Sequence, residues 1–388
     1  MNRKQFVILL GLVVVLGAAG LVIHQRSQQS WHRSGPSIGQ KLLPDFPVND
    51  IAQITIKSGT NQLNLARRDD VWTVAERGNY PANFAQISEL LLKFADLKIA
   101  QVEDIGPSQL GRFELLPAGA GANTGTQMEF KDASGKVRNS VLLGKKHLHK
   151  PSGGSQFGGM GDEGWPDGRY VQVDGANTVA LISDALDGVQ PKPESWLNKD
   201  FFSVENPRSI AVQFPEATNS WKLTRVTETN DWQLADSSAG EKLDDSKSSG
   251  VTSPFSSASF NDVLPGDTQP EAAGLTNVTT VVVETFDGFT YTVKLGQKHD
   301  DNIPLVLMVR ADLPTTRVAG QDENPTDKSK LDKAFADQQK KLADQLARAS
   351  RLAKWIYLVP GYVVEPLLKP RGELLAEAKK DAPSAAAK

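Results

Sequence analysis

An internal repeat constrains the fold of this chain more than any other feature. The segment FPVNDIAQITIKSGTNQLNLARRDDVWTV (46–74) aligns with FSVENPRSIAVQFPEATNSWKLTRVTETNDWQL (202–234), and SVLLGKKH (140–147) aligns with YTVKLGQKH (291–299). Trp72 falls on Trp232, and Leu143-Gly144 falls on Leu295-Gly296. Two copies of one fold therefore account for residues 46–184 and 201–312 of the 388. This suits the usual domain size of about 100–200 residues.

The first copy combines strands with one helix. AQITIKS (52–58) and NQLNLARR (61–68) alternate with a period of two around a turn, which is typical of a hairpin. PANFAQISELLLKFADLK (81–98) carries apolar residues at helical spacing and predicts an amphipathic helix. Further strands are expected at 126–132, 136–144, 169–175 and 178–183. The order predicts an α+β fold: two tandem copies of a mainly antiparallel sheet-plus-helix unit, followed by a C-terminal helical tail.

The second copy departs from the first where the helix should lie. Its segment SSGVTSPFSSASFNDVLPG (248–266) is rich in serine and is interrupted by Pro254 and Pro265. Proline disrupts a helix interior because it lacks the amide donor and clashes with the preceding turn. We therefore expect any helix in this segment to be short.

The repeated tryptophans, Trp72 and Trp232, can be interpreted in two ways. An aromatic residue in a loop can be an exposed ligand contact. A tryptophan that recurs at the same strand position of both copies is more simply a structural core anchor, packed between sheet and helix. We favour the core interpretation for both residues.

An uncharged apolar run, FVILLGLVVVLGAAGLVI, extends from Phe6 to Ile23. As a helix this run would span about 27 Å, the thickness of one hydrocarbon core. Arg3 and Lys4 precede it, so the positive-inside rule puts the N-terminus in the cytoplasm. We expect a single-pass transmembrane helix in the bacterial inner membrane, with the bulk of the chain in the periplasm. A cleaved signal peptide is the alternative, but Leu21-Val22-Ile23 continues the apolar run past the small residues.

The composition agrees with a periplasmic location. The chain contains no cysteine, which excludes disulfides, a thiolate nucleophile and cysteine-based metal sites.

The sequence divides into six expected segments. These are a cytoplasmic tip and anchor (1–24), a linker (25–45), the first repeat (46–200), the second repeat (201–325), a C-terminal helix with an aromatic segment (326–375) and a disordered tail (376–388).

Nucleic acids and nucleotides are not expected partners. The formal net charge is −3 with both signs mixed along the chain, so no basic field recruits nucleic acid. GMGDEG (159–164) satisfies the spacing G-x-G-x-x-G, but Asp162 and Glu163 would repel phosphate and no helix is predicted after it. A flexible hairpin loop is the better interpretation of this segment.

Catalytic and metal-binding patterns are equally weak. His147 and His149 would point to one side of a strand, and Asp162 or Glu163 could complete a metal site. Polar loop residues are the simpler interpretation. Only five histidines could serve as a general base, and the paired carboxylates (Asp69-Asp70, Asp244-Asp245, Asp300-Asp301) all fall in predicted turns. We expect no catalytic residues, no metal, no cofactor and no enzymatic activity.

The C-terminal tail carries the strongest sign of an interaction. A helix with Leu331, Phe335, Leu342 and Leu346 on one side is followed by a strand-like segment, KWIYLVP (354–360). Aromatic residues beside lysines suit a membrane interface or a partner groove. The candidate contacts are Trp355, Tyr357, Tyr362 and Leu367. The alternative, which we favour, is that this segment completes the sheet and core of the second copy.

Several weak motifs, in order, resemble one bacterial family. These are the N-terminal anchor, Trp72-x-Val74, Tyr80-Pro81-Ala82-Asn83, the leucine-rich helix, Leu143-Gly144, Arg169-Tyr170-Val171, Trp196-Leu197-Asn198-Lys199-Asp200-Phe201, and Trp355-Ile356-Tyr357 with Pro360 and Tyr362. Over residues 45–368 the chain resembles the family of domain of unknown function 4340, DUF4340. The loop at 150–168 and the weak second helix depart from the usual pattern.

The resemblance implies a function but no catalytic residue. Members are typically encoded beside ABC-type transporters and gliding-motility-type auxiliary membrane proteins. The expected function is therefore a non-enzymatic, periplasmic-facing accessory subunit that contacts an ABC-type permease and auxiliary membrane proteins. The alternative is a periplasmic binding module that holds an envelope polymer or small ligand between the two repeats. An envelope hydrolase is a third and weaker hypothesis.

Overall fold

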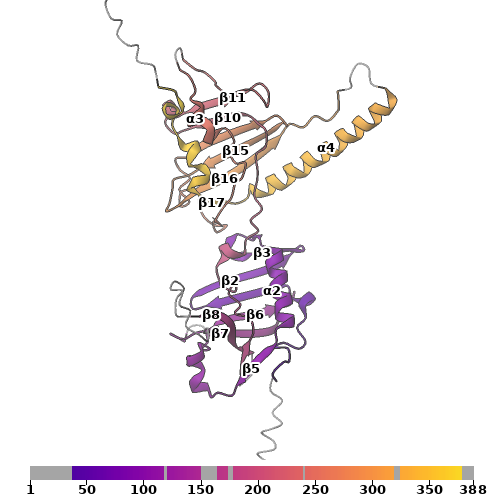
Figure 1. Ribbon diagram of the computed structural model, residues 1–388, viewed down its shortest axis with the longest axis vertical. Coiled ribbons are helices and arrows are strands. Elements are labelled where there is room, and N and C mark those ends of the chain that lie inside the picture. Colours follow the sequence, from indigo (N-terminus) through magenta and orange to yellow (C-terminus); the bar gives the residue numbers. More distant parts are fainter. Residues whose placement is uncertain are drawn as a thin grey trace, which may run out of the picture. The chain divides into compact units, whose positions relative to one another are not determined.

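The computed structural model describes residues 37–117, 120–149, 164–173, 178–238, 241–318 and 324–377. These residues form two antiparallel sheets and a small number of helices (Figure 1). They divide into two compact units: the described residues up to Gln62 together with Ser88–Pro191, and Leu63–Ile87 together with the described residues from Lys192 onward.

The first sheet has nine strands in the order β4-β3-β2-β1-β6-β7-β8-β9-β5. Their bounds are β1 (Gln53–Ser58), β2 (Asn61–Arg68), β3 (Val71–Val74), β4 (Tyr80–Pro81), β5 (Ile99–Glu103), β6 (Thr126–Lys131), β7 (Val137–His149), β8 (Trp165–Val173) and β9 (Val179–Ile182). Alternation builds one buried face, since Ile54 and Ile56 of β1 are fully buried while Lys57 is exposed. Strand β5 is not among the strands expected from the sequence.

The second sheet has eight strands in the order β12-β11-β10-β14-β15-β16-β17-β13. Their bounds are β10 (Pro207–Gln213), β11 (Trp221–Thr224), β12 (Gln233–Leu234), β13 (Asp262–Val263), β14 (Thr279–Thr285), β15 (Phe289–Leu295), β16 (Asn302–Ala311) and β17 (Tyr357–Pro360). The central strand β15 alternates strictly, with Phe289, Tyr291, Val293 and Leu295 buried on one face.

The two sheets share one topology. Eight neighbouring strands of the first sheet have one counterpart each in the second sheet. In spatial order, β3-β2-β1-β6-β7-β8-β9-β5 corresponds to β12-β11-β10-β14-β15-β16-β17-β13. The eight strands of each sheet also occur in the same order along the chain. Strand β4 has no counterpart in the second sheet. The second copy therefore extends beyond residue 325, because the tail contributes β17 between β16 and β13.

The repeated Leu-Gly pair marks a close backbone approach in both sheets. A Cβ on Gly144 would lie less than 3 Å from the backbone oxygen of Phe113, and a Cβ on Gly296 would lie 2.7 Å from the backbone oxygen of Gly274. Only glycine fits at this position, which explains why both copies carry it.

Four α-helices occur in the described residues: α2 (Phe84–Asp96), α3 (Asp245–Ser248), α4 (Pro325–Leu352) and α5 (Gly361–Val364). The leucine-rich helix predicted at 81–98 is α2, whose Phe94 lies 4.9 Å from Phe130 of β6, ring centroid to ring centroid. The end of the predicted linker is ordered against the same unit, since Leu42 and Leu43 are buried and the Leu42 amide donates to the oxygen of Leu97.

The predicted fold class needs correction. None of the helices in the described ranges combines the length and the apolar character that crossing a membrane requires, and the predicted span 6–23 lies outside those ranges. The second copy is not a sheet-plus-helix unit, because between β12 and β13 the α-helix is only α3, of four residues. The described molecule is thus two antiparallel sheets, with its longest helix, α4, in the tail.

Candidate functional site

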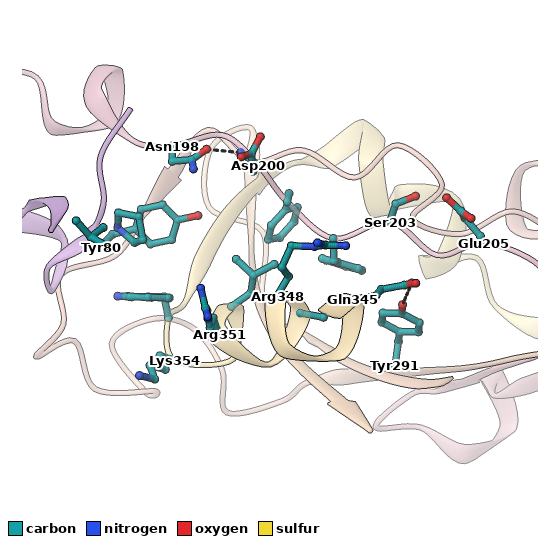
Figure 2. Close-up of a pocket in the computed structure, with 17 residues that line it drawn as sticks. Tyr80, Asn198, Asp200, Ser203, Glu205, Tyr291, Gln345, Arg348, Arg351 and Lys354 are labelled. Atoms are coloured by element: carbon teal, nitrogen blue, oxygen red, sulfur yellow. Dashed lines mark hydrogen bonds between the residues drawn. The ribbon is translucent and has the colours of Figure 1, made fainter. Parts of the chain in front are cut away.

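A pocket of about 600 Å³ opens at the C-terminal end of α4 in the second unit (Figure 2). Most of its wall comes from the tail around Gln345–Trp355, the connection Asn198–Glu205, and Tyr80 with Pro81 of β4. Val71 of β3 and Tyr291 of β15 complete the lining. The volume lies within the range of about 300–1,000 Å³ that small-molecule sites occupy.

Local hydrogen bonds fix Tyr80 at this pocket. The amide of Ala82 donates to the oxygen of Trp72 at 2.7 Å, and the amide of Asn83 donates to the oxygen of Trp196 at 2.8 Å. The amide of Asn198 donates back to Pro81 at 2.9 Å. The Tyr-Pro-Ala-Asn motif is thus held between β3 and the 196–198 segment.

The pocket has an aromatic wall. Tyr80 packs edge-on against Trp355, with 4.8 Å between ring centroids, and Phe202 stacks on Tyr291 at 6.1 Å. Phe201 also lines the pocket and lies 4.6 Å from the buried ring of Tyr357. These contacts bring together rings from β4, from the connection before β10, from β15 and from the tail.

Charged and amide groups line the rest of the pocket. Arg348, Arg351 and Lys354 lie on the last turn of α4 and just beyond it, and all three are exposed. Asp200 and Glu205 are the acidic lining residues. Figure 2 shows Arg348 in the middle of the pocket, with Tyr80 toward one end and Tyr291 toward the other.

No carboxylate of the described residues forms an ion pair with the three cations. Within the described part of the chain, none of Arg348, Arg351 and Lys354 has a carboxylate oxygen within 4.0 Å. The two dashed bonds in Figure 2 join other groups: the Asp200 amide donates to Asn198 at 2.8 Å, and Gln345 donates to the Tyr291 hydroxyl at 3.1 Å. The cations are therefore free to meet an anionic group of a ligand.

Burial perturbs the tyrosines beside the pocket. Desolvation raises the pKa of Tyr80 to about 12, with the hydrogen bond to Tyr357 acting in the opposite direction. Burial also raises the pKa of Tyr357 well above its usual range, and its hydroxyl donates to the oxygen of Leu352 at 3.0 Å. Both rings therefore stay neutral at physiological pH, and Tyr80 forms a fixed part of the pocket wall.

We expect Tyr80 to make the protein sensitive to alkali. Its contribution to stability is fully present below the unfolded-state pKa of about 10, and it is lost as the pH rises through the folded-state pKa of about 12. The raised pKa corresponds to a loss of about 2–3 kcal/mol from the free energy of unfolding across that interval. Urea unfolding between pH 9 and 12 should show a steeper decline for the wild type than for Tyr80→Phe. Parallel curves for the two proteins would contradict the assignment.

The four predicted contact residues of the tail differ in their burial in the structure. Tyr357 and Leu367 lie in the core, at 0% and 1% exposure, so they face no partner. Trp355 is half-buried and lines the pocket, and its indole nitrogen lies 3.4 Å from the oxygen of Gly78. Tyr362 is 73% exposed.

The two predicted core anchors also differ. Trp72 is buried in β3, between β2 and β4. Trp232 is half-buried just before β12, with the Arg225 guanidinium 4.8 Å above its ring. Strand β12 forms the edge of its sheet because β4 has no counterpart, so the second tryptophan lacks a covering strand. The buried indole of the second sheet is Trp221, whose nitrogen donates to the oxygen of Lys369 at 2.8 Å.

The two histidines singled out in the sequence share one carboxylate. Nδ1 of His147 lies 2.6 Å from Asp167, and Nδ1 of His149 lies 3.4 Å from its other oxygen. The described residues contain no group of three or more side chains arranged to hold a metal ion. Asp162, Glu163 and most of the GMGDEG segment lie outside the described ranges.

Most of the polar lining of the pocket was not predicted from the sequence. Glu205, Gln345, Arg348 and Arg351 belong to no motif, whereas Asp200 lies in the Trp196–Phe201 motif. These residues converge only because the tail returns to the second sheet. The available signals were the Tyr80-Pro81-Ala82-Asn83 and Trp196–Phe201 motifs, which carry the resemblance and flank the pocket.

Comparison with known proteins assigns the chain to a family. No curated protein and no solved structure matches it. One family profile, described as "Domain of unknown function (DUF4340)", matches residues 72–278. The match covers 207 of the 388 residues, counted from 72 to 278. It begins within β3 of the first sheet and ends directly before β14 of the second. The chain therefore belongs to the DUF4340 family.

Proposed function

We propose that this protein is a non-enzymatic accessory subunit of an ABC-type envelope membrane complex and works on the periplasmic side of the bacterial inner membrane. The observation that carries the proposal is the exposure of α4. This helix has 28 residues, about 42 Å at ~1.5 Å per residue. Figure 1 shows its N-terminal part running out from the strands of its own unit.

The exposed part of α4 has the pattern of a helix that binds a partner. Only Leu342 and Ala349 are buried among its described side chains, and both lie in the C-terminal half. The apolar stripe continues into the N-terminal half through Phe335 and Leu331, which is 45% exposed. Helices usually owe their stability to packing of such a stripe, so its unpacked half favours a docking role.

Charge also favours a partner protein. From Pro325 to Leu352 the helix carries seven basic and four acidic residues, whereas the whole chain has a net charge of −3. Asn324 caps its first turn through a bond from the Asp327 amide at 2.9 Å, and Arg317 pairs with Asp332 at 2.8 Å. These local bonds hold the helix in place without covering its apolar stripe.

The proposal is tested by purification from native membranes. A C-terminally tagged chain should recover an ABC-type permease and an auxiliary membrane protein. Leu331→Asp, which puts a charge in the exposed stripe, should reduce that recovery at least fivefold. Val226→Asp is the matched control, because Val226 is 83% exposed in the same unit but lies outside α4, and it should leave recovery unchanged. Equal recovery with both variants would contradict the role of α4, and a partner-free wild type would contradict the subunit proposal.

A second candidate function is favoured by the pocket. A cavity of about 600 Å³ with aromatic walls and uncompensated cations is suited to holding a small ligand or the end of a polymer. This binding module would use the base of α4, whereas the accessory role uses its exposed N-terminal half. The two functions are therefore compatible in one molecule.

A further inference from the structure

The lining of the pocket limits the chemistry of its ligand. The half-buried rings of Phe201 and Trp355 offer apolar faces with negative π-density, against which the weakly positive C–H bonds of a ring can pack. A flexible alkyl chain would also suit such faces. Asp200 and Glu205 in the same lining argue against a lipid tail, because an unpaired carboxylate facing hydrocarbon is costly.

The polar groups suit hydroxyls. Asn198, Asp200, Glu205, Gln345 and Arg348 are planar side chains, each with two or more donors or acceptors. Such groups can each engage two neighbouring hydroxyls of one sugar ring. Ser203 adds a further hydroxyl partner. This combination of ring faces and paired hydrogen-bonding groups suits a ligand with a polyol ring.

The charged residues of the lining suit a ligand that carries one negative charge. Arg348 and Arg351 are three residues apart, so they lie on one side of the end of α4, and Lys354 follows just beyond the helix in the same lining. With Asp200 and Glu205 opposing them, the lining carries a net charge of +1, three basic residues less two acidic ones. A polyphosphate would meet the two carboxylates, whereas one carboxylate can bind an arginine in two-point fashion.

We infer that this pocket binds an acidic saccharide: a hydroxyl-rich sugar ring that carries one carboxylate. The inference rests on the second candidate function and names its ligand class. The ring packs on Trp355 and Phe201, the hydroxyls meet the planar side chains, and the carboxylate meets Arg348 or Arg351. Such rings occur both as free uronic acids and as repeating units of acidic polysaccharides.

Calorimetric titration of the full chain with four probes tests this inference. The probes are a tetrasaccharide of alternating glucuronic acid and N-acetylglucosamine, free glucuronic acid, the neutral cellotetraose, and octanoate. The acidic tetrasaccharide should bind at least tenfold more tightly than cellotetraose, and octanoate should not bind. Tighter binding of the tetrasaccharide than of glucuronic acid would identify a polymer as the source, and equal binding would identify the free sugar acid.

Paired variants locate the binding. Arg348→Gln/Arg351→Gln should weaken binding of the acidic tetrasaccharide at least tenfold. Lys340→Gln/Lys341→Gln removes the same charge from exposed positions of α4 outside the pocket, and it should change affinity less than twofold. All four side chains are exposed, so both variants should fold, which circular dichroism checks.

The possible results distinguish failure of the acidic-saccharide inference from failure of the binding-module function on which it rests. Equal binding of the acidic and neutral tetrasaccharides, or of octanoate, would overturn the acidic-saccharide assignment while keeping a binding module. Equal loss in both charge variants would overturn the location. No binding of any of the four probes would overturn the inference together with the binding module, and would leave the accessory role to be judged by co-purification.

Discussion

Gly144→Ala is expected to lower the free energy of unfolding by about 2–3 kcal/mol, within the range for inserting an atom into a packed site. The new Cβ would lie less than 3 Å from the backbone oxygen of Phe113 and would also meet the side chain of Leu115. Backbone cannot move aside as a flexible side chain can, so the strand itself must shift. Chemical denaturation of the full chain measures the change.

The second copy should behave in the same way. Gly296→Ala places a Cβ 2.7 Å from the oxygen of Gly274, and a similar loss is expected. Gly188→Ala and Gly372→Ala are matched controls, because nothing lies within 4 Å of a Cβ at either site and neither has a positive φ. If Gly144→Ala and Gly296→Ala are as stable as these controls, close backbone approach is not the reason for the repeated glycine.

Arg77→Met is expected to cost about 2–4 kcal/mol of the free energy of unfolding, somewhat less than the loss of a fully buried pair. Arg77, at the end of the 3-10 helix Ala75–Arg77, binds Asp262 of β13 through two nitrogens, each at 2.8 Å. The two side chains are only 17% and 20% exposed. Removing the guanidinium leaves the Asp262 carboxylate largely desolvated without a cation.

A surface pair provides the control for this prediction. Arg208 and Glu284 lie 3.4 Å apart but are 53% and 40% exposed, so Arg208→Met should cost less than about 1 kcal/mol. The double variant Arg77→Met/Asp262→Leu should recover part of the loss, since it removes the stranded charge as well. Equal effects of Arg77→Met and Arg208→Met, or no recovery in the double variant, would contradict the account of this ion pair.

The repeat predicted much of the fold because it is a local pattern copied twice. Apolar alternation identified most strands of the first sheet, and α2 lies within its predicted range. The tail was expected to complete the second sheet, and β17 does lie in that sheet, between β16 and β13. Its neighbouring strands were harder to predict, because about 45 residues, including all of α4, separate β17 from β16 and no local pattern reveals a strand pairing across such an interval. Strand β5 was missed since only its first residue, Ile99, is buried.

The candidate site was less predictable than the sheets. Trp355 was identified through aromatic density in the tail, but the same density drew attention to Tyr357 and Leu367, which are core residues. Trp232 was matched to Trp72 by sequence alone, and the absence of a β4 counterpart in the second sheet makes the two environments different. The charges around the pocket come from segments more than a hundred residues apart, and only the folded chain brings them together.

The central claim, that the exposed half of α4 binds a membrane partner, is tested most directly by photo-crosslinking in cells. A benzophenone amino acid is placed at position 331 in the exposed stripe or, as the control, at position 226, and the adducts are identified by mass spectrometry. The account predicts an adduct with an ABC-type permease or its auxiliary membrane protein from position 331 and none from position 226. No adduct from position 331, or the same adducts from both positions, would contradict it.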